Sequence, residues 1–212
     1  MTLNYDLLLE QAIEAVTTAS IGDLRDYVDP KQKWMLVKLH GSVNWATRVV
    51  GGMEGASGTP DGVLSVVRAL PVGQAIAGRL EVIDHHSDRW DIDAGRARDL
   101  LYPAIAVPVE DKHEVCPADH LDELRSFLED CENFLFIGVS GRDMDLLELL
   151  GDSVKVGRET TIVSWSEPGK VYSRIQAEAP QLFRRGDNSL EGGFSQFISS
   201  GALDDFLRNR IG

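Results

Sequence analysis

Hydrophobic positions along the chain form short apolar runs that alternate with segments of helical spacing. The runs at 34–39, 133–138 and 159–165 have the length of strands, and the later two have the continuous apolar character of buried strands. Helical spacing is found at 6–18 and 117–131. Because apolar strands alternate with helices, the pattern predicts an α/β fold, with a mostly parallel sheet and helices on both faces.

Weaker signals complete the predicted order of elements. Asp6 stands at the N-cap position of the first predicted helix. The region from about 51 to 99 begins with a loop rich in Gly, Ser and Pro, and most of it favours no regular structure. The remaining predicted elements are strands at 43–50, 80–84 and 181–185, an extended segment at 101–108, a turn and helix over 139–151, and helices around 171–178 and over 193–210.

Charge and composition narrow the classes of function. The 212 residues carry a formal net charge of −13 without a stretch concentrated in Lys and Arg, so we expect no nucleic-acid partner. The two cysteines, Cys116 and Cys131, lack C-x-x-C spacing, which argues against a disulfide framework and a thiolate zinc site. No apolar run approaches the roughly 18–20 residues of a membrane helix, and no signal-peptide pattern is present. We therefore expect a cytoplasmic protein without a membrane partner, folded as a single domain over 1–212 with an insertion at about 51–99.

Polar residues gather in three segments next to predicted strands or helices: Thr2–Asp6, His40–Ser42 and Gly138–Asp143. Ligands of α/β sheets bind beyond the carboxyl ends of the strands, so we expect these segments at one rim of the sheet. Each segment taken alone also has an ordinary explanation as a turn or a helix cap.

Taken in order, these segments resemble the sirtuin family, and more closely its divergent bacterial sirtuin-like branch. The run TLNYD matches the T-x-N-x-D motif, and VKLHGSVNW matches the strand that leads into the catalytic His-Gly pair. The run FLFIGVSGRDMDLLELL is similar to the later nucleotide-binding strand and turn, with Asp143 in the G-x-S-x-x-D pattern. LYPAIAVPVEDKHEVCP and TIVSWSEPG also look like that branch. The resemblance covers most of 2–44 and 102–169, and it implies a Rossmann-like fold.

The chemistry that the resemblance implies is cleavage of the glycosidic bond between nicotinamide and ribose in NAD. The leaving group is a cationic pyridinium, so no strong general acid is needed, and an oxocarbenium-like transition state gains from nearby negative or dipolar groups. Asn4 would orient a water molecule or the amide of NAD. Asp6 would bind ribose hydroxyls or the carboxamide and add negative potential. His40 would act as general base on a ribose hydroxyl or on water.

The resemblance also implies which residues bind the rest of NAD. Backbone N–H groups around Gly138–Ser140, at a helix N-terminus, would hold phosphate or ribose oxygens. Ser164, after the next strand, would lie near the adenosine half. The implied NAD-binding residues are Thr2, Gly138, Ser140, Asp143 and Ser164.

The chain departs from the family in two ways. Sirtuin protein deacylases carry a four-cysteine zinc module, whereas the region at 51–99, which stands in its place, contains no such ligand set. We therefore expect no zinc, and NAD hydrolysis, the activity linked to bacterial antiviral members of the branch, is favoured over protein deacylation. The family also begins with a strand and a Gly-Ala-Gly-x-Ser loop that nothing here matches, so we expect an N-terminally truncated sirtuin-like domain.

Other interpretations stay open. The chain could be a catalytically incompetent NAD- or nucleotide-binding remnant or sensor, or an NAD-dependent protein deacylase. A second copy or another chain could complete the sheet, because an exposed edge is a template for strand pairing. The run VIDHHSD at 82–88 resembles the manganese motif of DHH phosphoesterases, although no Asp-x-Asp precedes it. His113, Cys116 and His120 stand close together in the sequence and could suggest zinc.

Overall fold

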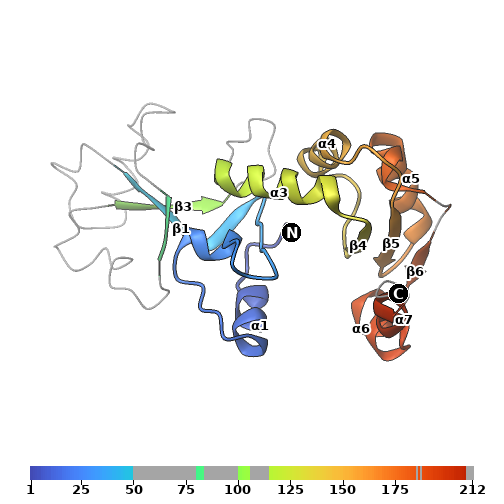
Figure 1. Cartoon of the computed structure of the whole chain (residues 1–212), viewed down its shortest axis with the longest axis horizontal. Coiled ribbons are helices and arrows are strands. Elements are labelled where there is room, and N and C mark those ends of the chain that lie inside the picture. Colours follow the sequence, from blue (N-terminus) through green and yellow to red (C-terminus); the bar gives the residue numbers. More distant parts are fainter. Residues whose placement is uncertain (50–79, 84–99, 106–114, 185, 187, 209–212) are drawn as a thin grey trace, which may run out of the picture. The chain divides into compact units, whose positions relative to one another are not determined.

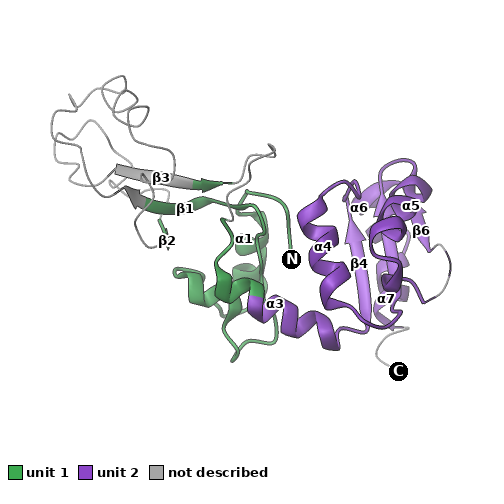
Figure 2. Cartoon of the chain, turned by 90° about the horizontal axis from the view of Figure 1, so that it is seen from above, with its two compact units in different colours: residues 1–121 green, residues 122–212 purple. Residues whose placement is uncertain are grey.

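A computed structural model of the chain describes two compact units, Met1–Leu121 and Asp122–Gly212, and each is presented by itself (Figures 1 and 2). Most of the expected insertion at about 51–99 lies outside the described residues, and so does the Asp-His-His run at 84–86. The described residues are 1–49, 80–83, 100–105, 115–184, 186 and 188–208.

The first unit contains a three-stranded antiparallel sheet with strand order β2-β1-β3. Its central strand β1 spans Gly41–Val49 and pairs with β2, Leu80–Val82, and with β3, Leu100–Ile105 (Figure 1). All three coincide with segments that the sequence predicts to be strands or extended chain. Because both pairings are antiparallel, the prediction of a mostly parallel sheet is wrong for this unit. Apolar runs indicate extended chain, but they carry little information about the direction in which two short strands pair.

The predicted strand at 34–39 is wrong, because in the described part of the chain this run forms no strand ladder. A single parallel bridge joins Thr2 to Lys38. The Thr2 N–H donates to the Val37 carbonyl over 2.8 Å, and the Leu39 N–H donates to the Thr2 carbonyl over 3.3 Å. The bridge therefore places the first residues of the chain against the segment that precedes β1.

Helix α1 spans Leu8–Val16 and is shorter than the predicted helix at 6–18. The prediction that Asp6 is its N-cap is wrong, because Leu7 holds that position without a side-chain cap. Oδ1 of Asp6 instead accepts a hydrogen bond from the Leu8 N–H over 3.1 Å. Asp6 therefore stabilises the turn that leads into the helix.

An aromatic cluster forms part of the core of the first unit. Tyr27 lies in the 3-10 helix η1, Leu24–Val28, and packs edge-to-face on Trp45 of β1, with 5.3 Å between the ring centroids. His120, near the start of helix α3, Ala118–Asp130, lies 5.9 Å from the Tyr27 ring and 5.7 Å from the Trp45 ring. Aromatic pairs of this geometry add to the stabilisation that burial provides. The cluster therefore joins the start of α3 to η1 and β1.

His120 is expected to make the stability of the first unit depend on pH. Its Nε2–H donates to the Leu24 carbonyl over 2.8 Å, and its Nδ1 has no hydrogen-bond partner among the described residues. Burial lowers the pKa of His120, against the opposing effects of the Leu24 hydrogen bond and the negative charge of Asp119. In the unfolded chain His120 takes up a proton at the ordinary histidine pKa, whereas in the folded unit it takes up that proton only at a lower pH. The Tm should therefore fall as the pH drops from about 7 to about 5.

A His120→Gln variant provides the control, because the amide can still donate to the Leu24 carbonyl but does not titrate. Thermal unfolding followed by the fluorescence of the buried Trp45 should show a weaker pH dependence in this variant than in the wild type. Equal pH dependence in the two proteins would contradict the role of His120.

The second unit contains a three-stranded parallel sheet with strand order β4-β5-β6. The strands are β4, Asn133–Ile137, β5, Glu159–Ser164, and β6, Ser189–Glu191. The prediction of parallel strands at 133–138 and 159–165 is confirmed. With its flanking helices, this unit has the mixed α/β character expected from the sequence.

The strands β4 and β5 differ in how they are covered. The residues Thr160–Val163 of the central strand β5 are all buried, as predicted for a strand covered on both faces. Strand β4 lies at the edge of the sheet, with Phe134 and Phe136 buried and Ile137 exposed. The prediction that β4 is covered on both faces is therefore wrong, because an apolar sequence does not reveal an edge position.

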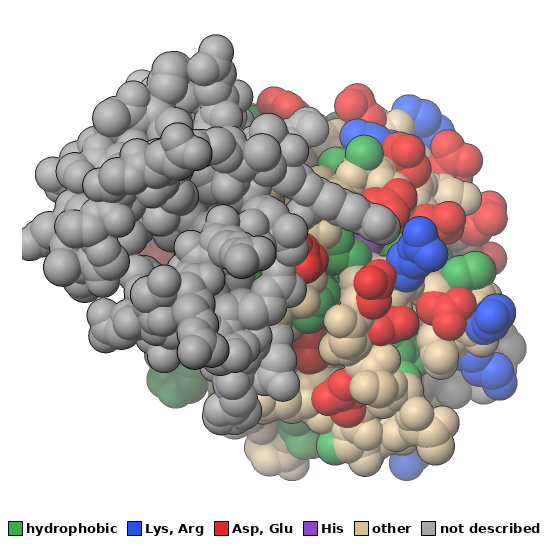
Figure 3. Space-filling view, turned by 90° about the vertical axis from the view of Figure 1, so that its left-hand side faces the viewer, with side chains coloured by type: hydrophobic (Ala, Val, Ile, Leu, Met, Phe, Trp, Pro, Cys, Tyr) green, Lys and Arg blue, Asp and Glu red, His purple; other side chains and the backbone are tan. Residues whose placement is uncertain are grey.

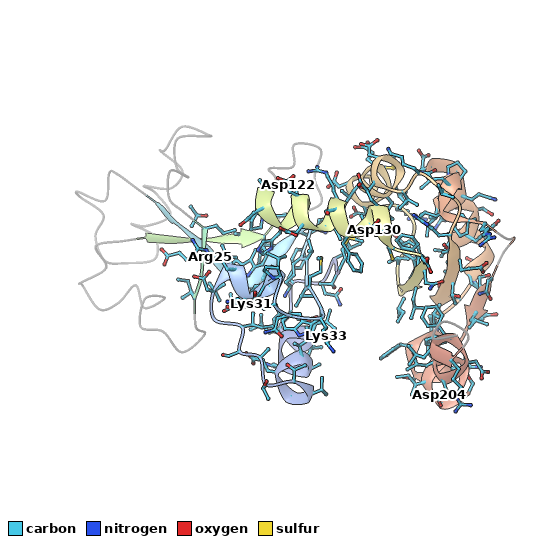
Figure 4. The ribbon with its side chains drawn as sticks, in the orientation of Figure 1. Arg25, Lys31, Lys33, Asp122, Asp130 and Asp204 are labelled. Atoms are coloured by element: carbon cyan, nitrogen blue, oxygen red, sulfur yellow. The ribbon has the colours of Figure 1, made fainter. Side chains whose placement is uncertain are left out.

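Helices flank the parallel sheet. Helix α5 packs against β5 and β6, α6 packs against β5, and α4 contacts α5. Side chains labelled in Figure 4 mark α3 (Asp122 and Asp130) and α7 (Asp204). Among the helices of the described ranges, none has both the length and the apolar character needed to cross a bilayer. The bounds of the helices that follow β4 are Met144–Ser153 for α4, Pro168–Glu178 for α5, Gly193–Ser199 for α6 and Ala202–Arg208 for α7.

The predicted short strand at 181–185 is wrong. Pro180–Leu182 forms the 3-10 helix η4, and the last strand of the sheet is β6, further along the chain. Proline favours the first turn of a helix, because its φ is already fixed near the helical value and its missing N–H would have no partner there. Leu182 is fully buried, so an apolar residue that suggested a strand fills the core from a helical turn.

Candidate functional site

The TLNYD segment and the His-Gly segment adjoin in the first unit. The Gly41 N–H donates to the Lys38 carbonyl over 3.2 Å, which closes a turn that contains His40. The Val43 N–H donates to the carbonyl of Tyr5 over 3.0 Å, and the ring centroids of Tyr5 and His40 lie 6.3 Å apart. Two segments more than 30 residues apart in sequence therefore form one local structure.

The side chains of the TLNYD segment alternate between exposure and partial burial. Asn4 and Asp6 are exposed, and Tyr5 between them is half-buried. Side chains two positions apart in extended chain share a face, so the exposure of Asn4 and Asp6 is consistent with both lying on one face of this segment. The Thr2 hydroxyl accepts a hydrogen bond from the Asn4 N–H over 3.1 Å, so it also stabilises the local turn. The exposed Asp6 carboxylate retains further acceptor capacity beside its bond to the Leu8 N–H.

Gly41 is required by the backbone of the His-Gly turn. Its φ is +82°, a left-handed conformation that side-chain-bearing residues rarely adopt. A Cβ atom at this position would lie 1.9 Å from the carbonyl oxygen of Ala104, the residue beside its β3 pairing partner Ile105. His40 itself is buried and only 8% exposed. The close approach of β3 therefore explains why the turn residue before β1 must be glycine.

A buried ion pair lies beneath the two segments, and the sequence interpretation misses it. Lys38 is 1% exposed, and its Nζ donates to Oε1 of Glu10 over 2.7 Å and to Oγ of Ser42 over 2.8 Å. The same Nζ bonds the backbone carbonyl of Asp6, and it lies 3.5 Å from the carbonyl of Tyr5. The lysine ammonium therefore connects the end of the TLNYD segment to α1 and to β1.

Glu10 has a second partner in the core. The Tyr27 hydroxyl donates to Oε1 of Glu10 over 3.0 Å. Burial and the negative charge of Glu10 raise the pKa of Tyr27, although the neighbouring Trp45 and Asn44 side chains oppose them, so this hydroxyl stays protonated and acts as a donor. The carboxylate of Glu10 thus accepts from a cation and from a phenol in the same buried network.

The sequence contains signals that could have revealed this network. Lys38 is a charged residue inside an apolar run, where a charge needs a buried partner. Glu10 interrupts the apolar positions of the first helix, and α1 buries Glu10 while Leu8 and Val16 are exposed. A buried helix face that carries a glutamate points to a cation on the segment packed against it.

The other predicted NAD-binding residues lie at the carboxyl edge of the sheet in the second unit. Ile137 of β4 is level with Val163 of β5, so Gly138 and Ser164 are near each other at this edge. The Gly138 N–H donates to the Val163 carbonyl over 2.9 Å and continues the strand ladder. The Ser164 hydroxyl donates to the Ser166 carbonyl over 2.9 Å. Gly138 follows the last residue of β4 and Ser164 ends β5, and both groups already make bonds within the protein.

The helix N-terminus expected at Gly138–Ser140 lies further along the chain. Helix α4 begins at Met144, and Asp143 is its N-cap, with Oδ1 accepting from the Leu146 N–H over 3.0 Å. The Ser140 carbonyl accepts from Nη1 of Arg174 over 3.0 Å, an interaction with α5 that the sequence did not predict. The Asp143 side chain therefore satisfies one of the backbone groups that an anion would bind at this helix end.

The residues of the zinc and manganese interpretations are only partly described. Nε2 of His120 is hydrogen-bonded to Leu24, and Cys116 is buried, whereas His113 and the Asp-His-His run at 84–86 lie outside the described residues. The described members therefore contribute to core packing in the first unit.

A shallow groove of about 550 Å³ in the second unit contains none of the predicted site residues. Three of its lining side chains are acidic, which opposes binding of an anionic nucleotide. On the described surface visible in Figure 3, basic side chains (blue) are scattered among acidic ones (red). The residues that line the groove are Met144, Leu147, Glu148, Gly151, Asp152, Glu178 and Gln181.

The predicted site residues thus fall into two groups, one in each unit. Thr2, Asn4, Asp6 and His40 belong to the first unit. The predicted residues of the second unit are Gly138, Ser140, Asp143 and Ser164. Comparison of the sequence with protein-family models gives no match, and comparison with curated proteins gives none either.

Proposed function

We propose that the chain is an NAD hydrolase of the sirtuin-like type, which cleaves the bond between nicotinamide and ribose. The observation that carries the proposal is the attachment of the TLNYD segment to the His40 turn through the Thr2–Lys38 bridge and the Tyr5 carbonyl. The proposal includes a Rossmann-like arrangement, a cytoplasmic location, no zinc, and a part in bacterial antiviral defence.

The proposed reaction converts NAD and water into ADP-ribose, nicotinamide and a proton. The bond between C1′ of the ribose and the pyridinium nitrogen breaks, and its electron pair stays with nicotinamide, which leaves as a neutral molecule. Asp6 stabilises the positive charge that develops on the ribose, and Asn4 orients the carboxamide or the attacking water. His40 takes the proton from that water or from a ribose hydroxyl.

A second candidate is a module that binds NAD or a related nucleotide without turnover. It is favoured by the burial of His40, which is only 8% exposed, because a general base must reach the proton that it removes. Binding without turnover needs no such access.

The experiment that separates the candidates measures free nicotinamide after incubation of the purified chain with NAD. The wild type should release nicotinamide, and His40→Ala should lower the rate by about 10²–10⁴-fold, the usual contribution of a general base. His120→Gln is the matched histidine control, because His120 contributes to the core and should be dispensable for the reaction. NAD binding measured by calorimetry without any nicotinamide release would support the binding module. Release that is unchanged in His40→Ala would contradict the proposed mechanism.

A further inference from the structure

We propose that Lys38 is a positioning residue that fixes the TLNYD segment to the His40 turn. It would set the relative placement of Asn4, Asp6 and His40 without contacting the substrate. The functional part of this inference rests on the proposed NAD hydrolysis, whereas the anchoring itself can be measured without it.

The first argument is that a single ammonium group adds side-chain bonds to the backbone bonds that join the TLNYD segment to residues 37–43. Nζ of Lys38 bonds the carbonyl of Asp6, lies 3.5 Å from the carbonyl of Tyr5, and donates to Ser42 over 2.8 Å. Ser42 in turn donates from its hydroxyl to the Tyr5 carbonyl over 3.3 Å. Lys38 therefore holds the segment that carries Asp6 at two successive backbone carbonyls, directly and through Ser42.

The second argument is that the backbone of Lys38 belongs to the other half of the site. Its carbonyl accepts from the Gly41 N–H and so closes the turn that contains His40. Its residue also forms the parallel bridge to Thr2. One residue thus fixes the turn through its backbone and the TLNYD segment through its side chain. Displacement of the ammonium group would change the distance between the TLNYD segment and the His40 turn.

The third argument concerns what holds the ammonium group in place. The Lys38 ammonium has three N–H donors, and its acceptors are the backbone carbonyls of the TLNYD segment, the Ser42 hydroxyl and the Glu10 carboxylate. The group therefore cannot rotate without losing one of these bonds. Glu10 is fixed in turn by Tyr27. Because charge-assisted bonds are about twice as strong as neutral ones, this buried group is a rigid anchor.

The anchoring is tested by NMR-detected amide exchange in the double variant Lys38→Met/Glu10→Gln, which leaves no unpaired buried charge. The Leu39 and Val43 amides donate to the carbonyls of Thr2 and Tyr5, so their exchange reports attachment of the TLNYD segment. We expect both amides to exchange about tenfold faster or more in the variant, the effect of losing one charge-assisted bond.

The control amide is that of Leu36, which donates to the Tyr27 carbonyl in the same unit, and its exchange should not change. The control variant is Lys33→Met, because Lys33, labelled in Figure 4, is an exposed lysine of the same segment. Unchanged exchange at Leu39 and Val43 would overturn the anchoring. Equal acceleration at all three amides would overturn it too, because it would show general destabilisation of the unit.

The functional part is tested by the rate of nicotinamide release. Misplacement of reacting groups by about 1 Å can cost about 10²-fold in rate, so kcat of the double variant should fall by about that factor. The KM for NAD should change less, and Lys33→Met should match the wild type. If the amide exchange shows that the TLNYD segment is loosened but kcat is unchanged, the positioning role is overturned. A wild type that releases no nicotinamide would instead refute the proposed hydrolysis, and the exchange measurements would still decide the anchoring.

Discussion

Replacing Gly41 with alanine is expected to destabilise the first unit by more than about 4 kcal/mol, a loss seen only for severe structural conflicts. The new Cβ would lie 1.9 Å from the Ala104 carbonyl oxygen, and a backbone atom of a paired strand cannot move aside cheaply. The φ of +82° adds strain for any residue with a side chain. Urea unfolding followed by tryptophan fluorescence measures the effect in this unit, because it contains the buried Trp45 and the core-packed Trp34, whereas Trp165 of the second unit is already 78% exposed.

Gly22→Ala is the matched control for this prediction. Gly22 lies in the same unit, and a Cβ atom there would have no atom within 4 Å. Its variant should change the free energy of unfolding by less than about 1 kcal/mol, and the change could be a small stabilisation. Equal and small effects at Gly22 and Gly41 would show that β3 can withdraw from the turn. The tight packing described for the His-Gly segment would then be refuted.

The surroundings of Gly41 show which features of its turn the sequence could predict. The His-Gly pair after an apolar run predicts a turn at the end of an extended segment, and the structure has that turn. The approach of β3 to within contact of Gly41 depends on residues some 60 positions away. No local pattern contains that information, so the reason for the glycine emerges only from the folded chain.

Strand direction was the largest error of the sequence interpretation. The runs at 133–138 and 159–165 are separated by a helix, and a connection of that length allows a parallel pairing. Strands β1, β2 and β3 are separated by segments that contain no predicted helix, and they pair in antiparallel fashion. Whether the sequence predicts a helix in the connection was therefore a better guide to direction than the apolar character of the strands.

The sequence predicted the candidate catalytic residues but not the residues that hold them in place. Asn4, Asp6 and His40 carry recognisable chemistry in the sequence, and the structure brings their segments together in one unit. Lys38 and Glu10 hold those segments, but composition alone does not distinguish them from exposed charged residues. Their role depends on burial, and burial is a property of the packed molecule.

Glu10→Gln is expected to destabilise the first unit by about 3–5 kcal/mol, because it leaves the Lys38 ammonium buried without a counter-ion. Lys38→Met should have a cost of the same order, since among the described residues it leaves the buried Glu10 carboxylate with the Tyr27 hydroxyl as its remaining hydrogen-bond donor. Urea unfolding monitored through Trp45 gives the free energy of unfolding for each variant.

The double variant Lys38→Met/Glu10→Gln should be more stable than either single variant, because it removes both buried charges while the glutamine carbonyl can still accept from Tyr27. A double-mutant cycle then gives a coupling energy of about 2–3 kcal/mol between the two side chains, the upper range for residues in one network. Lys33→Met, which removes an exposed charge, should stay within about 0.5 kcal/mol of the wild type. If the loss in free energy of unfolding in the double variant equals the sum of the two single losses, the two charges do not stabilise each other. The TLNYD segment would then have to be held by its backbone bonds to Val37, Leu39 and Val43 alone.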